Sequence, residues 1–420
     1  MRWSATATRA PPPSTAAATR CRRMCSPRCC SAAARAKANA MNFDLSEEQK
    51  MLRDAAQKFL RAEYGFDARN RIVASETGMS REHWRRFGEF GWLGVALPEA
   101  HGGFGGGMVE TIQVAEPMGA ALVVEPYLAS AVLGAQAVAR AGSPAQQAAW
   151  LPGLASGKLV LVLAHTEDDS GHQLAHVAAR AAAERGGWVL SGRKSGVLGA
   201  PWADGFVVAA RTAGAVHERR GISLFMVGAK TPGVQVAGYR VYDGSRAGDL
   251  LLDAVVLGRD ALLGVEGEGL GLLEQLIDIG IVAACADALG AMGALLRKTV
   301  EYTGTRKQFD VPIASFQVIQ HRLVDMFAAI EASRSLLLMA ALHAEHPDAA
   351  ARSRAASAAK AGIGERARFV AQQAVQLHGG VGMTEELDIG HYFRRLTLFC
   401  HLFGGSDHHL QRFAALRAAA

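Results

Sequence analysis

The sequence predicts an α+β multidomain protein in which an N-terminal α-helical domain, a middle antiparallel β domain and a C-terminal four-helix bundle follow one another. Three observations support this order. Apolar residues recur at helical spacing as far as Trp150, short β-rich runs lie between Leu159 and Leu257, and the helical period returns after Gly271. The corresponding domains are predicted to span residues 41–157, 158–262 and 263–420.

The first 40 residues form a leader of different composition. It contains eight Arg or Lys residues and no Asp or Glu, and removing it leaves 37 basic against 39 acidic residues, a net charge near −2. We expect this leader to be disordered. We interpret it as the product of a start codon assigned upstream of the true start, Met41, and a mitochondrial transit peptide is the alternative. The charge of the remaining chain predicts binding neither to nucleic acid nor to an anionic membrane.

The cysteines and the apolar runs indicate the cellular compartment in which the protein is expected. Only Cys285 and Cys400 lie outside the leader, both in apolar surroundings, which indicates a reducing compartment and packing roles rather than disulfides. Asp278 and Asp287 interrupt the longest apolar run, Ile277–Leu296, so no run reaches the roughly 18 residues of a membrane span. We therefore expect a cytoplasmic protein with no membrane span.

Within the domains, local signals define the elements. The first helix is predicted to begin after Ser46, which can form a capping box with Gln49, and the glycine-rich residues 97–107 predict a loop. The β-rich runs are Leu159–Ala164, Trp188–Leu190, Gly205–Ala210, Ile222–Val227, Gly233–Val236 and Leu250–Val256. Four helices fit between Gly269 and the C-terminus, separated near residues 303–316, His346 and residues 377–387.

Two glycine-rich segments, Gly267–Gly271 and Gly379–Gly382, superficially suggest dinucleotide-binding loops. Neither lies between a parallel strand and a helix of a βαβ unit, which the phosphate-binding role of such a loop requires. Taken alone, each is interpreted as a turn that enters a helix.

Three C-terminal segments carry a family signal. They read YTGTRKQFDVPIASFQ from Tyr302, QLHGGVGMTE from Gln376, and HYFRR from His391, which leads into LFGGSDHHL. In this order after a β domain, together with LSEEQKMLRD and GWLGVALPEAHGGFGG near the N-terminus, they resemble the acyl-CoA dehydrogenase family over about residues 42–415. The resemblance implies an FAD-dependent enzyme that removes a proton α to the carbonyl of an acyl-CoA thioester and transfers a hydride from the β carbon to the flavin. It also implies electron-transfer flavoprotein as the electron acceptor.

The resemblance assigns several residues to FAD. Arg306 matches the arginine that reaches the pyrophosphate of a neighbouring subunit's FAD, a role suited to a forked guanidinium donor. Phe309 and Gln317 match positions beside the adenine end, and Gln376 with the backbone of Gly379–Gly380 matches a segment that contacts the same cofactor. Because Arg306 would serve a neighbour, the resemblance implies at least a dimer.

The middle domain keeps part of the family pattern. Thr166 and Glu167 match the family's T-E strand, but the following Gly-Ser-Asp reads Gly171–Gln173, with histidine in the middle. The flavin-facing W-I-T or W-I-S segment reads KSGVL at residues 194–198. The resemblance thus assigns Thr166 to the cofactor, as it does Ser406 in the final segment, while two contacts to the flavin face have changed.

The family's catalytic base is absent from both positions where members carry it. In register with the final I-Y-E-G-T motif, LFGGSDHHL places Gly404 at the Glu, and the alternative helix position holds Ile281. An α-proton needs a positioned base and donors to the carbonyl oxygen. The double absence resembles the small, or partner, subunits of heteromeric enzymes such as pimeloyl-CoA dehydrogenase, which act on bulky or dicarboxylic acyl-CoAs in a heterotetramer with a large subunit that supplies the Glu.

Other interpretations stay open at this point. Asp407 is either a displaced base, which would make the chain a self-sufficient dehydrogenase and allow a homo-oligomer, or a cap of the following helix. The chain could also be a catalytically silent, flavin-binding structural subunit. A Ser406–His408 hydrolase triad is disfavoured because triad members are rarely consecutive. No metal site is expected, since the adjacent His408 and His409 point apart on a helix. A DNA-binding relative of the same fold is disfavoured by the charge of the chain.

Overall fold

The computed structural model describes residues 45–184 and 186–418, so the predicted leader, residues 1–40, lies outside the described part of the chain. The N-terminal part is helical, as predicted. Its α-helices are α3 (Glu47–Glu63), α4 (Phe66–Ala74), α5 (Arg81–Glu89), α6 (Met108–Ala120), α7 (Ala135–Ala141) and α8 (Pro144–Ala155). The shorter elements are the 3₁₀ turns η1 (Trp92–Gly94) and η2 (Glu99–His101) and the π-helix η3 (Tyr127–Gly134).

Aromatic side chains join the first helices. α3 begins at Glu47, directly after Ser46, where the capping signal predicts its start. The ring of Phe59 on α3 packs edge-on against Phe87 of α5 and Trp92 of η1, with centroid distances of 6.1 and 5.6 Å. These rings are almost completely buried, so they fix the two helices against the turn that follows them.

The middle part is a single eight-stranded sheet. Its strands are β1 (Leu161–Ala164), β2 (Arg180–Glu184), β3 (Gly187–Leu198), β4 (Gly205–Arg211), β5 (Ile222–Gly228), β6 (Val234–Arg240), β7 (Arg246–Gly258) and β8 (Leu262–Leu263), with the 3₁₀ turns η4 (Ala200–Trp202) and η5 (Arg259–Ala261). The strand order is β6-β7-β3-β2-β4-β5-β8, and β1 pairs with β4. The sheet is antiparallel, as predicted, except that β1 and β2 each run parallel to β4.

Two strands of this sheet escape the sequence prediction. β2 reads RAAAE, a sequence with a helical rather than a strand propensity, and β8 has only two residues. β2 becomes a strand because it pairs along its length with β3, placing Ala181 opposite Leu190 and Ala183 opposite Trp188. Tertiary pairing therefore overrides local propensity at this position.

The C-terminal part contains five α-helices between Gly269 and Ala418, not the four predicted. They are α9 (Gly269–Thr305), α10 (Gln317–His343), α11 (Ala349–His378), α12 (Ile389–His401) and α13 (Ser406–Ala418). The connections contain β9 (Lys307–Gln308), β10 (Val311–Pro312), η6 (Ile313–Ser315) and η7 (Gly379–Met383). The last predicted helix is divided because Phe403 and Gly404 adopt φ angles of 58° and 110°, which no α-helix contains.

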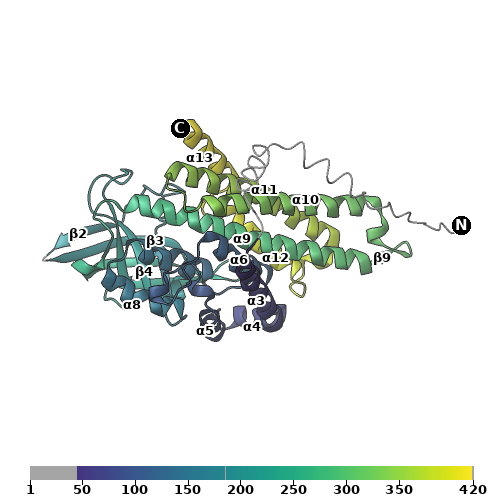
Figure 1. The fold of residues 1–420 in the computed structure, drawn as a ribbon, viewed down its shortest axis with the longest axis horizontal. Coiled ribbons are helices and arrows are strands. Elements are labelled where there is room, and N and C mark those ends of the chain that lie inside the picture. The colour runs from purple at the N-terminus through teal and green to yellow at the C-terminus, as the bar shows by residue number, and fades with distance from the viewer. Residues whose placement is uncertain (1–44, 185, 419–420) are drawn as a thin grey trace, which may run out of the picture. The chain divides into compact units, whose positions relative to one another are not determined.

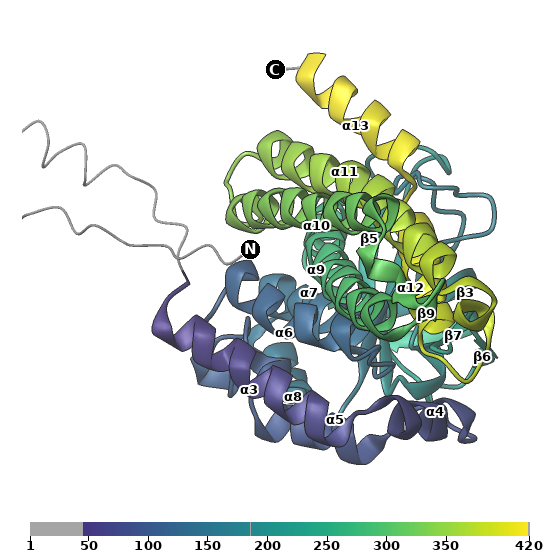
Figure 2. The same ribbon diagram turned by 90° about the vertical axis from the view of Figure 1, so that its right-hand side faces the viewer.

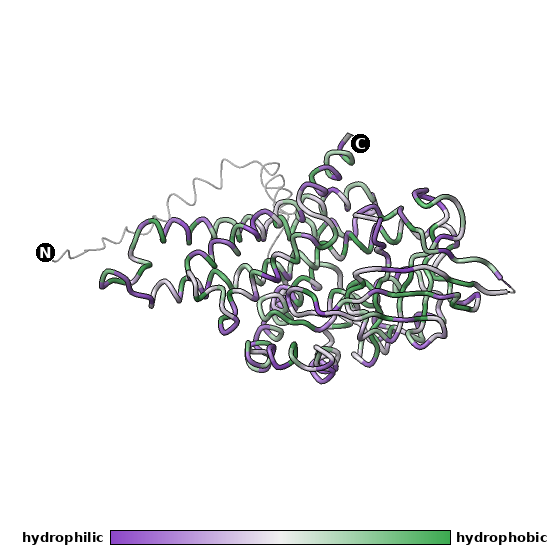
Figure 3. The backbone as a smooth tube through the Cα atoms, turned by 180° about the vertical axis from the view of Figure 1, so that it is seen from behind, coloured by the Kyte–Doolittle hydropathy of each residue, from purple (hydrophilic) through white to green (hydrophobic). Residues whose placement is uncertain are grey.

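The long helix α9 organises the core. It runs from the sheet along the other C-terminal helices (Figure 1) and lies between α6 on one side and α10 and α11 on the other (Figure 2). Its contact with α6 is close, because a methyl group at Gly290 would lie 1.8 Å from the carbonyl oxygen of Glu116. By length and composition α9 could cross a membrane, but 83% of its most apolar stretch is buried inside the protein, as in a core helix. Hydrophobic stretches follow the strands and the inner helices (Figure 3).

Candidate active site

A cavity of about 490 Å³ lies where the sheet meets α9 and α13. Its wall is formed by η3, the loop that follows β1, the end of β3, the beginning of α9, and residues 401–412. Apolar side chains such as Leu133, Leu163 and Ile277 cover much of this wall. Five histidines also line the cavity, namely His165, His172, His401, His408 and His409. Of the residues predicted to contact the cofactor, Thr166 lines this cavity.

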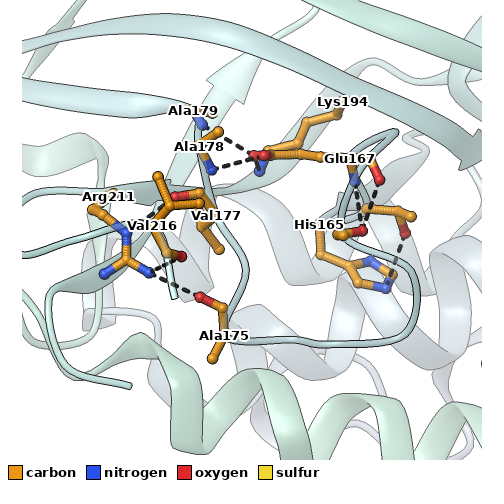
Figure 4. A network of polar contacts seen from close by, with 11 residues as sticks. His165, Glu167, Ala175, Val177, Ala178, Ala179, Lys194, Arg211 and Val216 are labelled. Atoms are coloured by element: carbon orange, nitrogen blue, oxygen red, sulfur yellow. Dashed lines mark hydrogen bonds and ion pairs between the residues drawn. The ribbon is translucent and has the colours of Figure 1, made fainter. Parts of the chain in front are cut away.

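A buried ion pair holds the loop that follows β1 (Figure 4). Lys194 of β3, which is completely buried, donates to Glu167 at 2.6 Å, and the backbone N–H groups of Ala178 and Ala179 donate to the same carboxylate at 2.7 and 3.0 Å. Burial alone would raise the pKa of the Glu167 carboxyl, but these partners outweigh it and lower the pKa below its usual value. Glu167 is therefore a structural anion beside the cavity.

Arg211 fixes the far side of the same loop (Figure 4). This arginine at the end of β4 is 1% exposed and donates to the carbonyl oxygens of Ala175, Val177 and Val216 at 2.9, 3.0 and 2.8 Å. Ala175 lines the cavity, so the guanidinium determines the course of the chain along the cavity wall.

The segment between α12 and α13 closes the opposite wall. Lys360 of α11 is completely buried and donates from Nζ to the carbonyl oxygen of Gly404 at 2.8 Å. The ammonium also lies 4.5 Å from the ring centroid of Phe399. Burial lowers the pKa of Lys360. The backbone of Gly404, the residue that the motif alignment sets against the family's glutamate, is thus held directly by a buried cation.

The space beside Gly404 is already filled. A methyl group on Gly404 would lie 2.6 Å from Cδ2 of His408 and 3.2 Å from Nε2 of His409. His409 is 1% exposed and is held by the carbonyl oxygen of Phe403 at 3.0 Å and by the Ser357 hydroxyl at 3.3 Å. Burial lowers the pKa of His409 to about 3, so this imidazole is neutral.

The second family position for the base is also apolar. Ile281 is completely buried on α9. The nearby Asp278 accepts from Arg412 of α13 at 2.8 Å and from Ser353 of α11 at 2.6 Å. Asp278 therefore ties three helices together and is already paired.

Two predicted residues of the final segment lie away from the cavity wall. Asp407 is exposed in the first turn of α13 and does not line the cavity, whereas the next two residues, His408 and His409, do. The hydroxyl of Ser406 points to α11, where it donates to the carbonyl oxygen of Ala361 at 3.3 Å. The structure thus gives neither side chain the cavity position that the motif alignment suggests.

The remaining predicted cofactor residues gather at the other end of α9. Tyr302 stacks on His378 with a centroid distance of 4.4 Å, which joins the end of α9 to the end of α11. The side chains on this corner are exposed, and Phe309 reaches 88% exposure. This corner, which we call the Arg306 corner, contains Arg306, Phe309, Gln317, Gln376, Gly379 and Gly380.

The Arg306 corner and the cavity of the same chain are far apart. Ile277 lines the cavity and Thr305 ends α9, so 28 residue steps separate them along one helix. At roughly 1.5 Å per residue this corresponds to about 42 Å. In Figure 1, β9 marks the corner at the opposite end of α9 from β2, β3 and β4. The two sets of residues cannot contact one small molecule within a single chain.

Comparisons with known proteins agree along the chain. Family profiles described as the N-terminal, middle and C-terminal domains of acyl-CoA dehydrogenase match residues 46–158, 162–255 and 267–416. The acyl-CoA dehydrogenase FadE12 of Mycobacterium tuberculosis is 30% identical over 361 residues, covering 83% of this chain and 90% of that protein. The mitochondrial isovaleryl-CoA dehydrogenase of Oryza sativa is 31% identical over 367 residues, covering 86% and 88%.

Solved structures show the same similarity. The ChsE4-ChsE5 complex from Mycobacterium tuberculosis is 30% identical, with a TM-score of 0.80 over 90% of this chain and 100% of that chain. A variant of the Tcur3481-Tcur3483 steroid ACAD is 30% identical, with a TM-score of 0.80 over 89% and 98%. The FAD complex of PigA is 25% identical, with a TM-score of 0.83 over 90% and 99%.

Together the three-part fold and the cavity between sheet and helices define a flavin-dependent oxidoreductase. The chain belongs to the acyl-CoA dehydrogenase family, and it is an acyl-CoA dehydrogenase with FAD as cofactor and acyl-CoA as substrate. FAD, when bound, supplies the oxidant that accepts a hydride from the substrate.

The residues present fit this cofactor. Nδ1 of His165 is buried in the cavity wall without a hydrogen-bond partner among residues 45–184 and 186–418, so a ligand with polar ring atoms can satisfy it. Burial lowers the pKa of His165 to about 4, which leaves the imidazole neutral. Gly196, which lines the cavity, has φ of 63° and no atom within 4 Å of its Cβ direction, so the cavity is open there.

Proposed function

We propose that this chain is the small, or partner, subunit of a heteromeric FAD-dependent acyl-CoA dehydrogenase, and that a large subunit supplies the catalytic glutamate. The observation that carries the proposal is the state of the two base positions. Gly404 has no side chain and lies against His408, and Ile281 is completely buried. Without a carboxylate at either position, the chain lacks the group that removes the α-proton in the family.

The geometry of α9 supports an oligomeric assembly. The Arg306 corner, about 42 Å from the chain's own cavity, presents a guanidinium and backbone glycines that suit the phosphates of a nucleotide. These groups serve a cofactor only if a neighbouring chain brings its own flavin site to the corner. The large subunit of a heterotetramer is the neighbour that we propose, and a second copy of this chain is the alternative.

Relatives support the same assignment and suggest the substrate class. Structures described as a ChsE4-ChsE5 complex and as a steroid ACAD are among the similar ones. We infer a bulky or dicarboxylic acyl-CoA as substrate, electron-transfer flavoprotein as acceptor, and a cytoplasmic location. No residue in the cavity by itself defines the acyl chain.

Coexpression tests the proposal. The chain is purified alone and together with a large acyl-CoA dehydrogenase subunit encoded beside it that carries the glutamate, and flavin reduction by acyl-CoAs is followed by absorbance. We expect the chain alone to be yellow and to reduce its flavin slowly. The complex should reduce flavin fast, and its rate should fall when the partner's glutamate is changed to glutamine. An isolated chain that reduces its flavin as fast as the complex would contradict the proposal.

Two other roles give different results in the same experiment. A silent structural subunit would leave the complex active after every substitution in the cavity of this chain. A self-sufficient dehydrogenase that uses Asp407 would be fast alone and would lose that rate in Asp407→Asn. The exposed position of Asp407, off the cavity wall, gives this second role no support.

A further inference from the structure

One cavity side chain has no structural task. His408 lines the cavity and is partly buried, and its ring packs 5.1 Å from the ring of His172 and 5.0 Å from that of His409. Neither ring nitrogen of His408 makes a hydrogen bond to the described residues. His409, by contrast, uses both of its nitrogens to hold Phe403 and Ser357.

The imidazole of His408 lies beside the residue that the motif alignment assigns to the family's glutamate. The imidazole lies on the side of Gly404 from which a glutamate side chain would start, because Cδ2 is 2.6 Å from where Cβ would be. The ring is carried four residues further along the chain, in the first turns of α13, and reaches back over the Gly404 backbone. An imidazole therefore fills the space in which a side chain at residue 404 would begin, while glycine stands at that position in the sequence.

Burial and the surrounding groups favour the neutral form of His408. Burial lowers its pKa most, and His172 from the loop after β1, Arg412 on α13 and Lys360 on α11, which face the ring, lower it further. The two carboxylates of α9 nearest to the cavity wall are already paired, Glu274 with Arg219 at 2.8 Å and Asp278 with Arg412 at 2.8 Å. A neutral imidazole with a free lone pair is the protonation state that a general base needs.

We propose that His408 is the proton acceptor of this chain's own cavity. The Cα–H bond of the acyl-CoA breaks and its proton goes to an imidazole nitrogen of His408. The bonding electron pair forms the Cα=Cβ double bond, and FAD, when bound, would supply the two-electron oxidant that accepts the β-hydrogen with its electron pair. The imidazolium then returns its proton to solvent.

This role goes beyond the proposed subunit function. The partner's glutamate works in the partner's cavity, whereas His408 works in the cavity of this chain. A base with a lowered pKa abstracts a weakly acidic proton slowly, so this activity is the slow rate expected of the chain alone.

Proton exchange isolates the step. The full chain, loaded with FAD, is incubated in D₂O with 3-thiaoctanoyl-CoA, in which sulfur replaces the β carbon and no β-hydride can leave. Mass spectrometry then measures deuterium at the α carbon. We expect His408→Gln to lower the exchange rate by roughly a hundredfold. His343→Gln, an exposed histidine on α10, is the matched control and should exchange like the wild type. Flavin content and melting temperature verify that each variant folds.

Two further measurements strengthen the test. In His408→Gly, free imidazole should restore the exchange, because removal of the ring leaves its volume open beside Gly404. In the wild type, the exchange rate should fall as pH drops through a midpoint below the usual histidine value, the direction of the His408 pKa shift.

Three results would overturn the proposal: wild-type protein without measurable exchange, unchanged exchange in His408→Gln, or loss of exchange in Asp407→Asn. These three results test only the role of His408. The subunit assignment is tested separately, by the gain in rate when the chain is coexpressed with the large subunit. If coexpression gives no gain while His408→Gln abolishes exchange, the chain has its own base and needs no partner.

Discussion

The imidazole of His408 occupies the space that a side chain at Gly404 would need, with Cδ2 only 2.6 Å from the position of a Cβ atom. Gly404 itself has a φ angle of 110°, and its carbonyl oxygen is held by buried Lys360. The backbone conformation and the neighbouring ring therefore both favour a glycine at this position. The packing around residue 404 therefore leaves no room for a larger side chain.

Gly404→Ala should destabilise the protein. The new methyl group meets His408 and the backbone is forced into a conformation that side chains avoid, so we expect a loss of about 2 kcal/mol in the free energy of unfolding. Gly405→Ala is the control, because its Cβ would be 3.8 Å from the nearest atom at ordinary φ, and a change within about 0.5 kcal/mol is expected. Urea unfolding measures both variants, and equal losses would show that strain at residue 404 is not the cause.

Glu167→Gln should be more damaging than its neighbour Asp168→Asn. Removal of the Glu167 charge leaves the buried Lys194 ammonium without its anion, which costs about 3 kcal/mol or more. Asp168 is 61% exposed and lies 3.5 Å from Arg193, so its loss should cost under about 1 kcal/mol. The comparison uses urea midpoints at neutral pH. Similar midpoints for the two variants would show that the buried pair contributes no more than the surface pair.

His409 should make the protein sensitive to acid. Its pKa is about 3 in the folded chain, whereas an unfolded histidine titrates near its ordinary value, so the unfolded state binds the extra proton as pH falls from 7 to 5. The contribution of the His409 side chain to the free energy of unfolding is fully present above pH 6.5 and is smaller by about 2 kcal/mol at pH 5.

Unfolding titrations at pH 7 and pH 5 test this effect. His409→Gln should reduce the difference in stability between the two pH values, although it also removes a packed ring at both. His343→Gln should leave the difference as in the wild type. An unchanged pH dependence in His409→Gln would mean that this ring is not the titrating group.

Arg306→Ala should weaken flavin binding without affecting the fold of the chain that carries it. The residue is exposed at the end of α9 and makes no side-chain hydrogen bond or ion pair within the described chain, so we expect an unchanged melting temperature for the unfolding of the polypeptide without flavin. In the assembled protein, we expect FAD to dissociate at least about tenfold more readily, because the proposed contact of the guanidinium with a phosphate would be lost. Arg259→Ala, exposed on η5, is the control. Equal FAD retention in the two variants would remove Arg306 from the cofactor site.

Sequence and structure agree best where a motif and a local pattern coincide. The three-part order, six of the strands and the absence of a carboxylate at Gly404 and Ile281 could all be read from the sequence. The break that separates α12 from α13 was missed, although the two glycines at residues 404 and 405 signal it. β2 could not be found, because the strand conformation of its alanines comes from pairing with β3 rather than from their own propensity.

The histidines of the cavity were the main site residues that sequence reasoning missed. His165 and His172 come from the loop after β1 and His408 from α13, and only the tertiary fold brings them to one wall. One signal for His408 was present. A residue four positions after a glycine, in the first turns of a helix, projects its side chain back over that glycine. Asp407 is closer to Gly404 in sequence, but its side chain leaves the helix in another direction and faces solvent.

Because α9 separates the cavity from the Arg306 corner, a chain of this design has two ends that can change independently. A gene duplicate can lose its carboxylate at one end and still offer an intact phosphate-binding corner to its sister chain. Selection then retains the duplicate because its corner binds the cofactor of the sister chain, and not because of a reaction in its own cavity. The length of one helix is enough to make the division of labour between two subunits an accessible evolutionary step.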